Sequence, residues 1–224
     1  MLSWSLLELT FRVAVVATVV NIPLALGVSW LLVKTRVPGR LIVDVLVSLP
    51  LAVPPIAIGF FLLLLLGREG PIGGLTHALL GADIVFTWYA AVAASAVVSF
   101  PLMARATMVA MAGVDARLEM SARSLGAGPW RVFFTITVPL ASKGILAGVL
   151  LGFVRAISEF GATITVAGNI AGKTQTLPLA LYSAVILRDD STALLLTAIA
   201  IAIAVATLVV HNWLLAKTPR PEVA

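Results

Sequence analysis

Five long apolar runs constrain the fold of this chain more than any other feature of its sequence. They lie near residues 9–33, 43–66, 84–106, 142–160 and 192–215. A bilayer core about 30 Å thick requires about 20 apolar residues in an α-helix, so each run is long enough to cross a membrane once. With 61% hydrophobic and 11% charged residues, the chain of 224 residues is too apolar for a soluble domain. We therefore expect an all-α polytopic membrane protein with about five transmembrane helices, forming a single domain over residues 1–224.

The positions of lysine and arginine predict the orientation of these helices. Ten fall on one side of the expected bundle: Lys34, Arg36, Arg40, Arg105, Arg117, Arg123, Arg131, Lys143, Lys217 and Arg220. Four fall on the other side: Arg12, Arg68, Lys173 and Arg188. Under the positive-inside rule the richer side is cytoplasmic, which places the N-terminus outside and the C-terminus inside. Because the basic residues lie in loops beside apolar runs, the net charge of +5 does not indicate a nucleic-acid partner.

This orientation defines two loops of interest. A cytoplasmic loop is expected at about residues 107–141, and an external loop at about residues 161–190. Within the external loop, residues 178–187 are too few to cross a bilayer. We expect them to form a short re-entrant or interfacial helix.

A polar, glycine-containing segment at residues 118–139 lies within the cytoplasmic loop. The residues before Gly126 favour a helix, and Asp115 is placed to cap its start. Gly126 is expected to end that helix in the left-handed conformation, and Gly128-Pro129 to begin a second one. The sequence therefore predicts two short helices that meet at an angle, an arrangement suited to docking. The alternative is an ordinary amphipathic connector.

The same segment resembles the Glu-Ala-Ala loop in the membrane subunits of bacterial ABC importers. That pattern is Glu-Ala-Ala, three residues, Gly, nine residues, Ile, one residue, Leu-Pro, and Met120-Ser121-Ala122, Gly126, Ile136 and Val138-Pro139 fall in its register. Met120 occupies the acidic position, and Glu119 comes one place early. Successive side chains are about 100° apart around a helix axis, so Glu119 does not replace the missing carboxylate on the same face. The resemblance implies a coupling helix that docks onto an ATPase subunit, formed by Glu119, Met120, Ser121, Ala122, Arg123, Gly126, Ala127, Ile136 and Pro139.

A second resemblance extends over nearly the whole chain. Residues 159–163 (Glu-Phe-Gly-Ala-Thr), 168–178, Pro54-Pro55 and Ser99-Phe100-Pro101 are similar to the corresponding parts of molybdate permeases. Sulfate and tungstate permeases share parts of this pattern. The resemblance implies the type I permease fold of an ATP-driven molybdate importer in the inner membrane. It also implies a second copy of the chain, an ABC ATPase subunit in the cytoplasm and a molybdate-binding protein outside.

The chain shows no ATP-binding motif of its own. Residues 168–174 end in Gly-Lys-Thr like a phosphate-binding loop, but that motif needs four residues between its glycines and this segment has three. We interpret it as an external turn. His77 and His211 are far apart and the serines in the apolar runs lack a base, so we expect no catalytic, metal or cofactor site. ATP and Mg²⁺ would bind to the partner ATPase. A different class, an ion-coupled secondary anion carrier or a channel, is the alternative.

Two ionisable residues fall deep inside the fourth apolar run. Counted from Lys143, Arg155 lies about 18 Å and Glu159 about 24 Å into a core of about 30 Å. Ionisable residues at such depth often mark a transport path, which makes Arg155, Glu159, Phe160 and Gly161 candidates for the translocation path or gate. Arg155 and Glu159 are four residues apart, on one face of a helix, so their charges can also neutralise each other. We favour that pairing over direct contact with the substrate.

Gly144, Gly148 and Gly152 form a stripe on the same run, at intervals of four residues. Small residues at this interval allow two membrane helices to approach each other closely. We expect a role in helix packing, either within this chain or against a second copy.

Overall fold

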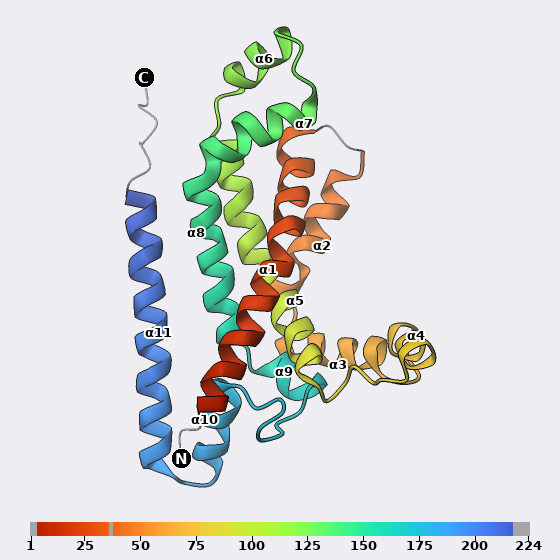
Figure 1. Ribbon diagram of the computed structural model, residues 1–224, viewed down its shortest axis with the longest axis vertical. Helices are drawn as coiled ribbons and strands as arrows, with labels where there is room; N and C mark the ends of the chain where they lie inside the picture. Colours follow the sequence, from red (N-terminus) through yellow and green to blue (C-terminus); the bar gives the residue numbers. More distant parts are fainter. Residues whose placement is uncertain (1–3, 36–37, 217–224) are drawn as a thin grey trace.

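The structure, a computed structural model, describes residues 4–35 and 38–216 and is helical throughout this part of the chain (Figure 1). In chain order its elements are α1 (Trp4–Lys34), α2 (Arg40–Ala52), α3 (Pro55–Leu66), α4 (Pro71–Leu80), α5 (Trp88–Ala112), α6 (Ala116–Ser124), α7 (Pro129–Val132), the π-helix η1 (Phe133–Thr137), α8 (Val138–Ile157), α9 (Gly161–Val166), α10 (Leu177–Ile186) and α11 (Asp190–Ala216). The all-α prediction is confirmed.

Four helices of the described residues are long and apolar enough to cross a membrane. They are Trp4–Lys34, Trp88–Ala112, Pro129–Ile157 and Asp190–Ala216. They run along the longest axis of the molecule, with α6 and α7 near one end and α9 and α10 near the other (Figure 1). A fifth span is present only if α2 and α3 are counted together.

The second expected span, residues 43–66, was wrongly predicted as one helix. It is divided into α2 and α3, which are bent by 113° with respect to each other. The break follows from Pro54 and Pro55, which lack N–H donors and whose rings clash with the preceding turn of a helix. Val53 takes an extended conformation, with φ −89° and ψ 135°. As a result α3 leaves the direction of the long helices and packs against α9 instead.

The fourth span begins earlier and ends earlier than expected. Pro129 opens a helix that continues through α7, η1 and α8 to Ile157, so the second short helix predicted in the cytoplasmic loop is not separate. The expected span of 142–160 is therefore corrected at its end. Glu159 and Phe160 lie in the short link before α9 and not inside the spanning helix.

Helix α5 lies at the centre of the bundle, between α1 and α8. Ala90, Ala91 and Ala94 are fully buried, so small side chains separate α5 from its neighbours in its first two turns. The glycine stripe of α8 faces α5: a Cβ atom built on Gly144 would lie 2.6 Å from the Cβ atom of Ala110, and one on Gly148 2.9 Å from that of Ala106. A Cβ atom on Gly152 would lie 2.7 Å from the methyl carbon of Met103. The stripe therefore packs within the chain.

Polar side chains fix the register of α1 against α5. The amide of Asn21 donates to the carbonyl of Ala96 over 2.9 Å and to the hydroxyl of Ser99 over 3.1 Å. Further along the same two helices, the hydroxyl of Ser29 donates to the carbonyl of Ala104 over 3.2 Å. Hydrogen bonds between apolar helices hold them in one arrangement, so α1 and α5 form a defined pair.

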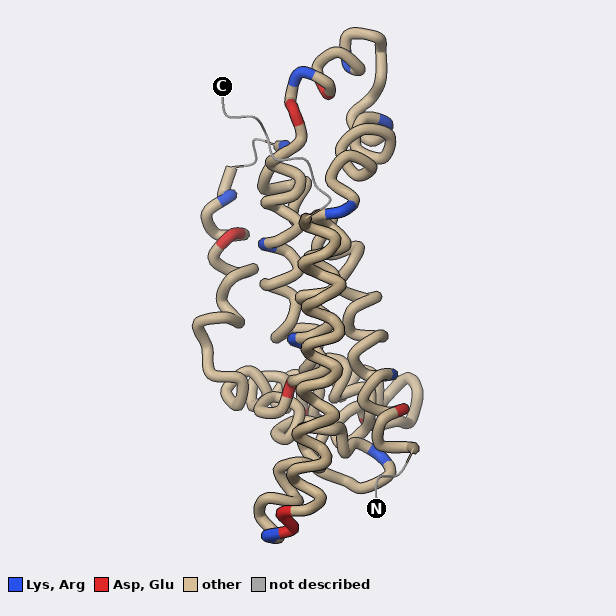
Figure 2. Tube along the Cα trace, turned by 90° about the vertical axis from the view of Figure 1, so that its left-hand side faces the viewer, with Lys and Arg blue, Asp and Glu red and all other residues tan. Residues whose placement is uncertain are grey.

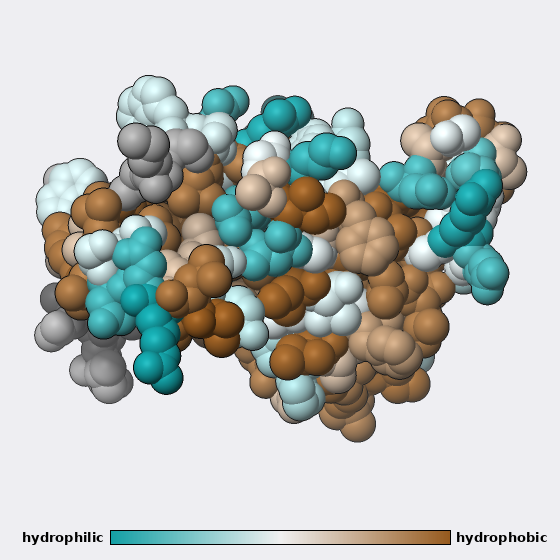
Figure 3. All heavy atoms as spheres, turned by 90° about the horizontal axis from the view of Figure 1, so that it is seen from below, coloured by the Kyte–Doolittle hydropathy of each residue, from teal (hydrophilic) through white to brown (hydrophobic). Residues whose placement is uncertain are grey.

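The charged residues gather toward the two ends of the long helices, and few lie between (Figure 2). Helix α1 starts at one end and α11 finishes at the other, which agrees with termini on opposite sides (Figure 1). Three residues used to predict the orientation, Arg36, Lys217 and Arg220, lie outside the described residues. Seen from the end where α1 starts, hydrophilic and hydrophobic residues are interspersed (Figure 3).

Much of the apolar surface is exposed on this single chain. In helix α11 only Leu196 is buried, and the helix contacts α8 and α10. Residues 67–83, between the second and third expected spans, contain helix α4 (Pro71–Leu80), which carries the exposed side chains of Leu75, Leu79 and Leu80. Surface of this kind suits lipid or another apolar partner.

Candidate functional site

The first of the two short helices predicted in the cytoplasmic loop is present as α6, and the residues at its two ends act as the sequence predicted. The carboxylate of Asp115 accepts a hydrogen bond of 2.8 Å from the N–H of Arg117 at the start of the helix. At its end Gly126 has a φ of +85°, and the N–H of Ala127 donates over 3.0 Å to the carbonyl of Ala122. A left-handed residue after a helix satisfies carbonyls that the last turn leaves open. The loop that connects the long helices is thus residues 113–128, shorter than the predicted 107–141.

Glu119 faces the bundle and not the solvent. It is 7% exposed, and its Oε1 atom lies 2.9 Å from the Nζ atom of Lys34 at the end of α1. The hydroxyl of Thr137 in η1 donates to the same oxygen over 2.7 Å. Sequence reasoning missed Lys34 and Thr137 as partners. Lys34 was interpreted only as an orientation signal, and nothing in the sequence indicated that Thr137 would lie beside α6.

The opposite face of α6 is open. Met120, which occupies the acidic position of the importer pattern, is 58% exposed, and Leu125 is 90% exposed. Ser121 and Arg123 are exposed as well, and Ala122 is half-buried. The rotation argued from the sequence is therefore confirmed: Glu119 and Met120 point to different sides of the helix. Arg117 and Arg123 of α6 are exposed too, as is Arg131 in the neighbouring α7, so the exposed surface of this region carries apolar side chains and positive charge.

Of the remaining predicted coupling residues, Ala127 lies in the link after α6, and Ile136 and Pro139 belong to the helix that follows it. Ala127 and Ile136 are half-buried and Pro139 is exposed in the first turn of α8, so they do not extend the open face of α6. Aromatic rings join this helix to α1. Trp130 stacks on Trp30 with ring centroids 5.0 Å apart, and Phe133 meets the Trp30 ring edge-on at 6.0 Å.

The candidate path residues come together where α8 ends. The Nη1 atom of Arg155 lies 2.7 Å from Oε2 of Glu159, and the other carboxylate oxygen accepts from the N–H of Ala162 over 2.8 Å. The side chain of Glu159 is 1% exposed and that of Arg155 is 27% exposed. The ring of Phe160 lies 5.1 Å from that of Tyr182, which connects the link to α10. The charge of Arg155 is thus compensated within the chain.

Gly161 begins α9 at a point of close contact with α3. A Cβ atom built on Gly161 would lie 3.1 Å from the ring of Pro55. A Cβ atom on Gly59 in α3 would lie 2.6 Å from the carbonyl oxygen of Ala162. The bend at Pro54-Pro55 therefore brings α3 directly against the segment that holds Glu159.

The segment that resembles a phosphate-binding loop closes on itself as a turn. The hydroxyl of Thr174 donates to the carbonyl of Gly168 over 3.2 Å and accepts from the N–H of Ile170 over 3.1 Å. The Thr174 hydroxyl is therefore engaged within the turn, and the amide of Asn169 donates to the hydroxyl of Ser183 in α10. Among residues 4–35 and 38–216, no three His, Cys, Asp or Glu side chains come together to form a possible metal site.

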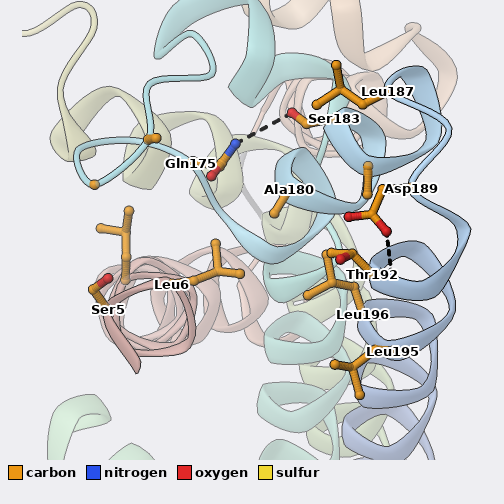
Figure 4. A pocket seen from close by; sticks show the side chains of 14 residues that line it. Ser5, Leu6, Gln175, Ala180, Ser183, Leu187, Asp189, Thr192, Leu195 and Leu196 are labelled. Carbon is orange, nitrogen blue, oxygen red and sulfur yellow. Dashed lines mark hydrogen bonds between the residues drawn. The ribbon is translucent and has the colours of Figure 1, made fainter. Parts of the chain in front are cut away.

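A cavity of about 430 Å³ lies beside this turn, between the start of α1, α10 and the start of α11 (Figure 4). Its polar lining includes Gln175, Ser183 and Asp189. Hydrogen bonds from the side chain and the N–H of Thr192, and from Ser191, lower the pKa of Asp189 from an ordinary 3.8 to about 2. The cavity lining includes this carboxylate and neither lysine nor arginine, so it offers no charge complementary to an oxyanion.

Comparison with protein families gives one match over almost the full chain. Residues 8–220 match the family described as the inner membrane component of binding-protein-dependent transport systems. The molybdenum transport system permease protein ModB of Escherichia coli K12 is 44% identical over 212 residues, which cover 94% of this chain and 93% of ModB. The sulfate transport system permease protein CysW of Synechocystis is 35% identical over 175 residues, which cover 78% of this chain and 63% of CysW.

A solved structure shares the arrangement of the helices. A bacterial ABC transporter involved in the import of the acidic polysaccharide alginate superimposes with a TM-score of 0.69, covering 97% of this chain and 79% of the transporter chain. The sequence identity is 15%, so this likeness concerns the fold alone.

Proposed function

Because the chain belongs to the family of inner membrane components of binding-protein-dependent transport systems, we propose that it is the membrane-spanning subunit of an ATP-driven molybdate importer. It is a multi-pass permease of the inner membrane, and it is not the ATPase. The assignment of molybdate as the substrate is supported by the 44% identity to a molybdenum permease over 94% of the chain. Identity to a sulfate permease is lower, at 35% over a shorter stretch.

Coupling to ATP hydrolysis takes place at the open face of α6. The loop of residues 113–128 lies at the end of the bundle where the positive-inside rule places the cytoplasm. Its exposed apolar side chains, Met120 and Leu125, suit an apolar groove, and the surrounding arginines suit an acidic rim on that groove. An ABC ATPase subunit with such a groove docks here, and ATP and Mg²⁺ bind to that subunit.

Transport follows from alternate opening of the two ends of the bundle. ATP binding brings the ATPase subunits together, α6 moves with them, and the spanning helices open outward to accept the ion from a molybdate-binding protein. Hydrolysis resets the arrangement. Two copies of this chain enclose the path between them, which gives the exposed apolar faces of helices such as α3 and α4 a partner besides lipid.

Arg155 serves mainly to hold the link at the end of α8. Its guanidinium is neutralised by Glu159 at 2.7 Å, so it does not form a strong anion site. A strong site midway along the path would retain molybdate instead of releasing it. The partial exposure of Arg155, 27% of its side chain, leaves room for a passing contact with the anion.

Uptake by reconstituted protein tests this function. Proteoliposomes that contain the chain, its ATPase and its binding protein are expected to accumulate labelled molybdate only when ATP is present. Unlabelled molybdate should compete strongly and sulfate at equal concentration weakly. Accumulation without any ATPase would show a secondary carrier or channel instead. Stronger competition by sulfate or tungstate than by molybdate would reassign the substrate within the same family.

A further inference from the structure

A buried ion pair joins the docking helix to the first spanning helix. Lys34 is the last residue of α1, and Glu119 lies 85 residues later in α6, yet their charged atoms are 2.9 Å apart. The two side chains are only 11% and 9% exposed. The hydroxyl of Thr137 donates to Glu119 over 2.7 Å, and Lys34 also donates to the carbonyl of Val114 over 3.4 Å. We call this group of side chains, Lys34, Glu119 and Thr137, the clamp.

The chemistry of the clamp is unusual for a contact that only contributes stability. Removing two charges from water costs free energy that their attraction regains only when the geometry is well defined, and apolar side chains of similar size often stabilise as well or better. What a charged, hydrogen-bonded pair adds is a fixed relative position. The clamp fixes α6 relative to both α1 and η1.

A second contact supports the same connection. Trp30 lies one helical turn before Lys34 on α1, and its ring stacks on that of Trp130 at 5.0 Å. Residues four apart share a face of a helix, so one face of α1 contacts the docking loop through Lys34 and the helix that follows this loop through Trp30. The loop is thus attached to α1 as well as to α5 and α8, with which it is continuous in the chain.

Helix α1 extends from the clamp to the opposite end of the bundle. It is unbroken over Trp4–Lys34, and near its start the hydroxyl of Thr10 accepts a hydrogen bond of 2.9 Å from the N–H of Leu177, the first residue of α10. A displacement of α6 that reaches Lys34 is therefore applied to an element that also touches the outer segment. Packed helices transmit such displacements as nearly rigid bodies.

We propose that Lys34 and Glu119 are positioning residues for transport, because they make the docking helix and α1 move together when the ATPase closes. This inference rests on the proposed function. Without the clamp, α6 remains docked on the ATPase and ATP is still hydrolysed, but the movement no longer reaches α1. The measurable consequence is a lower ratio of molybdate transported to ATP hydrolysed.

A removable cross-link tests this directly, because the chain contains no cysteine. The double variant Lys34→Cys/Glu119→Cys is reconstituted with cysteine-free partners, and molybdate uptake and ATP hydrolysis are measured in the same proteoliposomes. A short bis-methanethiosulfonate then spans the gap that the two long side chains filled, and dithiothreitol cleaves it again. We expect the transport ratio to fall by about tenfold in the variant, to recover after cross-linking and to fall once more after reduction. Val205→Cys/Val209→Cys, two exposed positions on α11, serves as the matched control and should show no change.

Two results would overturn the inference. One is an unchanged transport ratio in the double variant; the other is a lowered ratio that the cross-link does not restore. If the double variant fails to assemble, Glu119→Gln decides, since it keeps the shape and an acceptor for Thr137 but loses the charge. A ratio equal to that of the wild type rejects the clamp, and a ratio lowered about threefold or more supports it. Failure of the wild type itself to transport molybdate with ATP would instead reject the proposed function.

Discussion

Replacement of Glu159 by alanine is expected to destabilise the folded subunit by about 3 to 5 kcal/mol. The carboxylate is almost fully buried and has two partners, the guanidinium of Arg155 at 2.7 Å and the N–H of Ala162 at 2.8 Å. Alanine would leave both without an acceptor at the point where α8 ends and α9 begins. Thermal unfolding in detergent, followed by the loss of the monodisperse protein, measures the effect.

Two variants separate the contributions to this loss. Glu159→Gln keeps an acceptor for Ala162 but removes the charge, so it should lose only part of the stability. Arg155→Ala leaves the carboxylate with its backbone donor, and if it assembles and transports at the wild-type rate, Arg155 acts in packing alone. A Glu159→Ala subunit with the melting temperature of the wild type would contradict the assigned role of the link.

Replacement of Gly126 by valine is expected to reduce ATP-driven uptake by about tenfold or more while membrane insertion stays intact. Gly126 has a φ of +85°, and a β-branched residue is strained there by about 1 to 2 kcal/mol. Nothing lies within 4 Å of the position of its Cβ atom, so the effect would come from the backbone and not from a clash. The strain would open the turn after α6 and change the angle at which the helix meets the ATPase.

The chain offers a close control for this experiment. Gly128 lies two residues later with a φ of −68° and open space around its Cβ position, so Gly128→Ala should transport normally. Gly126→Asn should lose less than valine, because asparagine tolerates the left-handed conformation. Uptake and ATP hydrolysis measured together distinguish uncoupling from failure to assemble. Normal ATP-driven uptake by the Gly126→Val subunit would argue against this role for the turn.

Local signals predicted helix α6 well. Asp115 and Gly126 act within a few residues of the chain, as a cap and a left-handed turn, and neither depends on distant contacts. The one-residue offset of Glu119 was also enough to predict that it faces away from Met120, because helix geometry fixes the rotation. The partners of Glu119 were not predictable, since Lys34 is brought to it only by the packing of α1 against the rest of the bundle.

The positions of four of the five expected spans were predictable from apolar length, but the bend within the second was not. Residues 43–66 are apolar on both sides of Pro54-Pro55, so hydrophobic length indicated one span. Two prolines permit a kink, but they do not fix its angle, and the bend of 113° also brings α3 into contact with α9. The end of α8 was mispredicted for a similar reason. Residues 158–160 follow the apolar run without a helix-breaking residue, so the sequence did not show that the helix ends before them. In the structure the N–H of Ala162 donates to the carboxylate of Glu159 at the start of α9.

The sidedness of α6 tests the central claim most directly, namely that an ATPase acts on this permease through a cytoplasmic loop. Because the chain has no cysteine, Leu125→Cys, at a side chain 90% exposed, is a unique label site, and Leu187→Cys, 77% exposed beyond α10, marks the other end. With a membrane-impermeant maleimide, Leu125→Cys should react only in inverted vesicles and be protected by the bound ATPase, whereas Leu187→Cys should react in intact spheroplasts. Reaction of Leu125→Cys from outside intact spheroplasts would contradict the account.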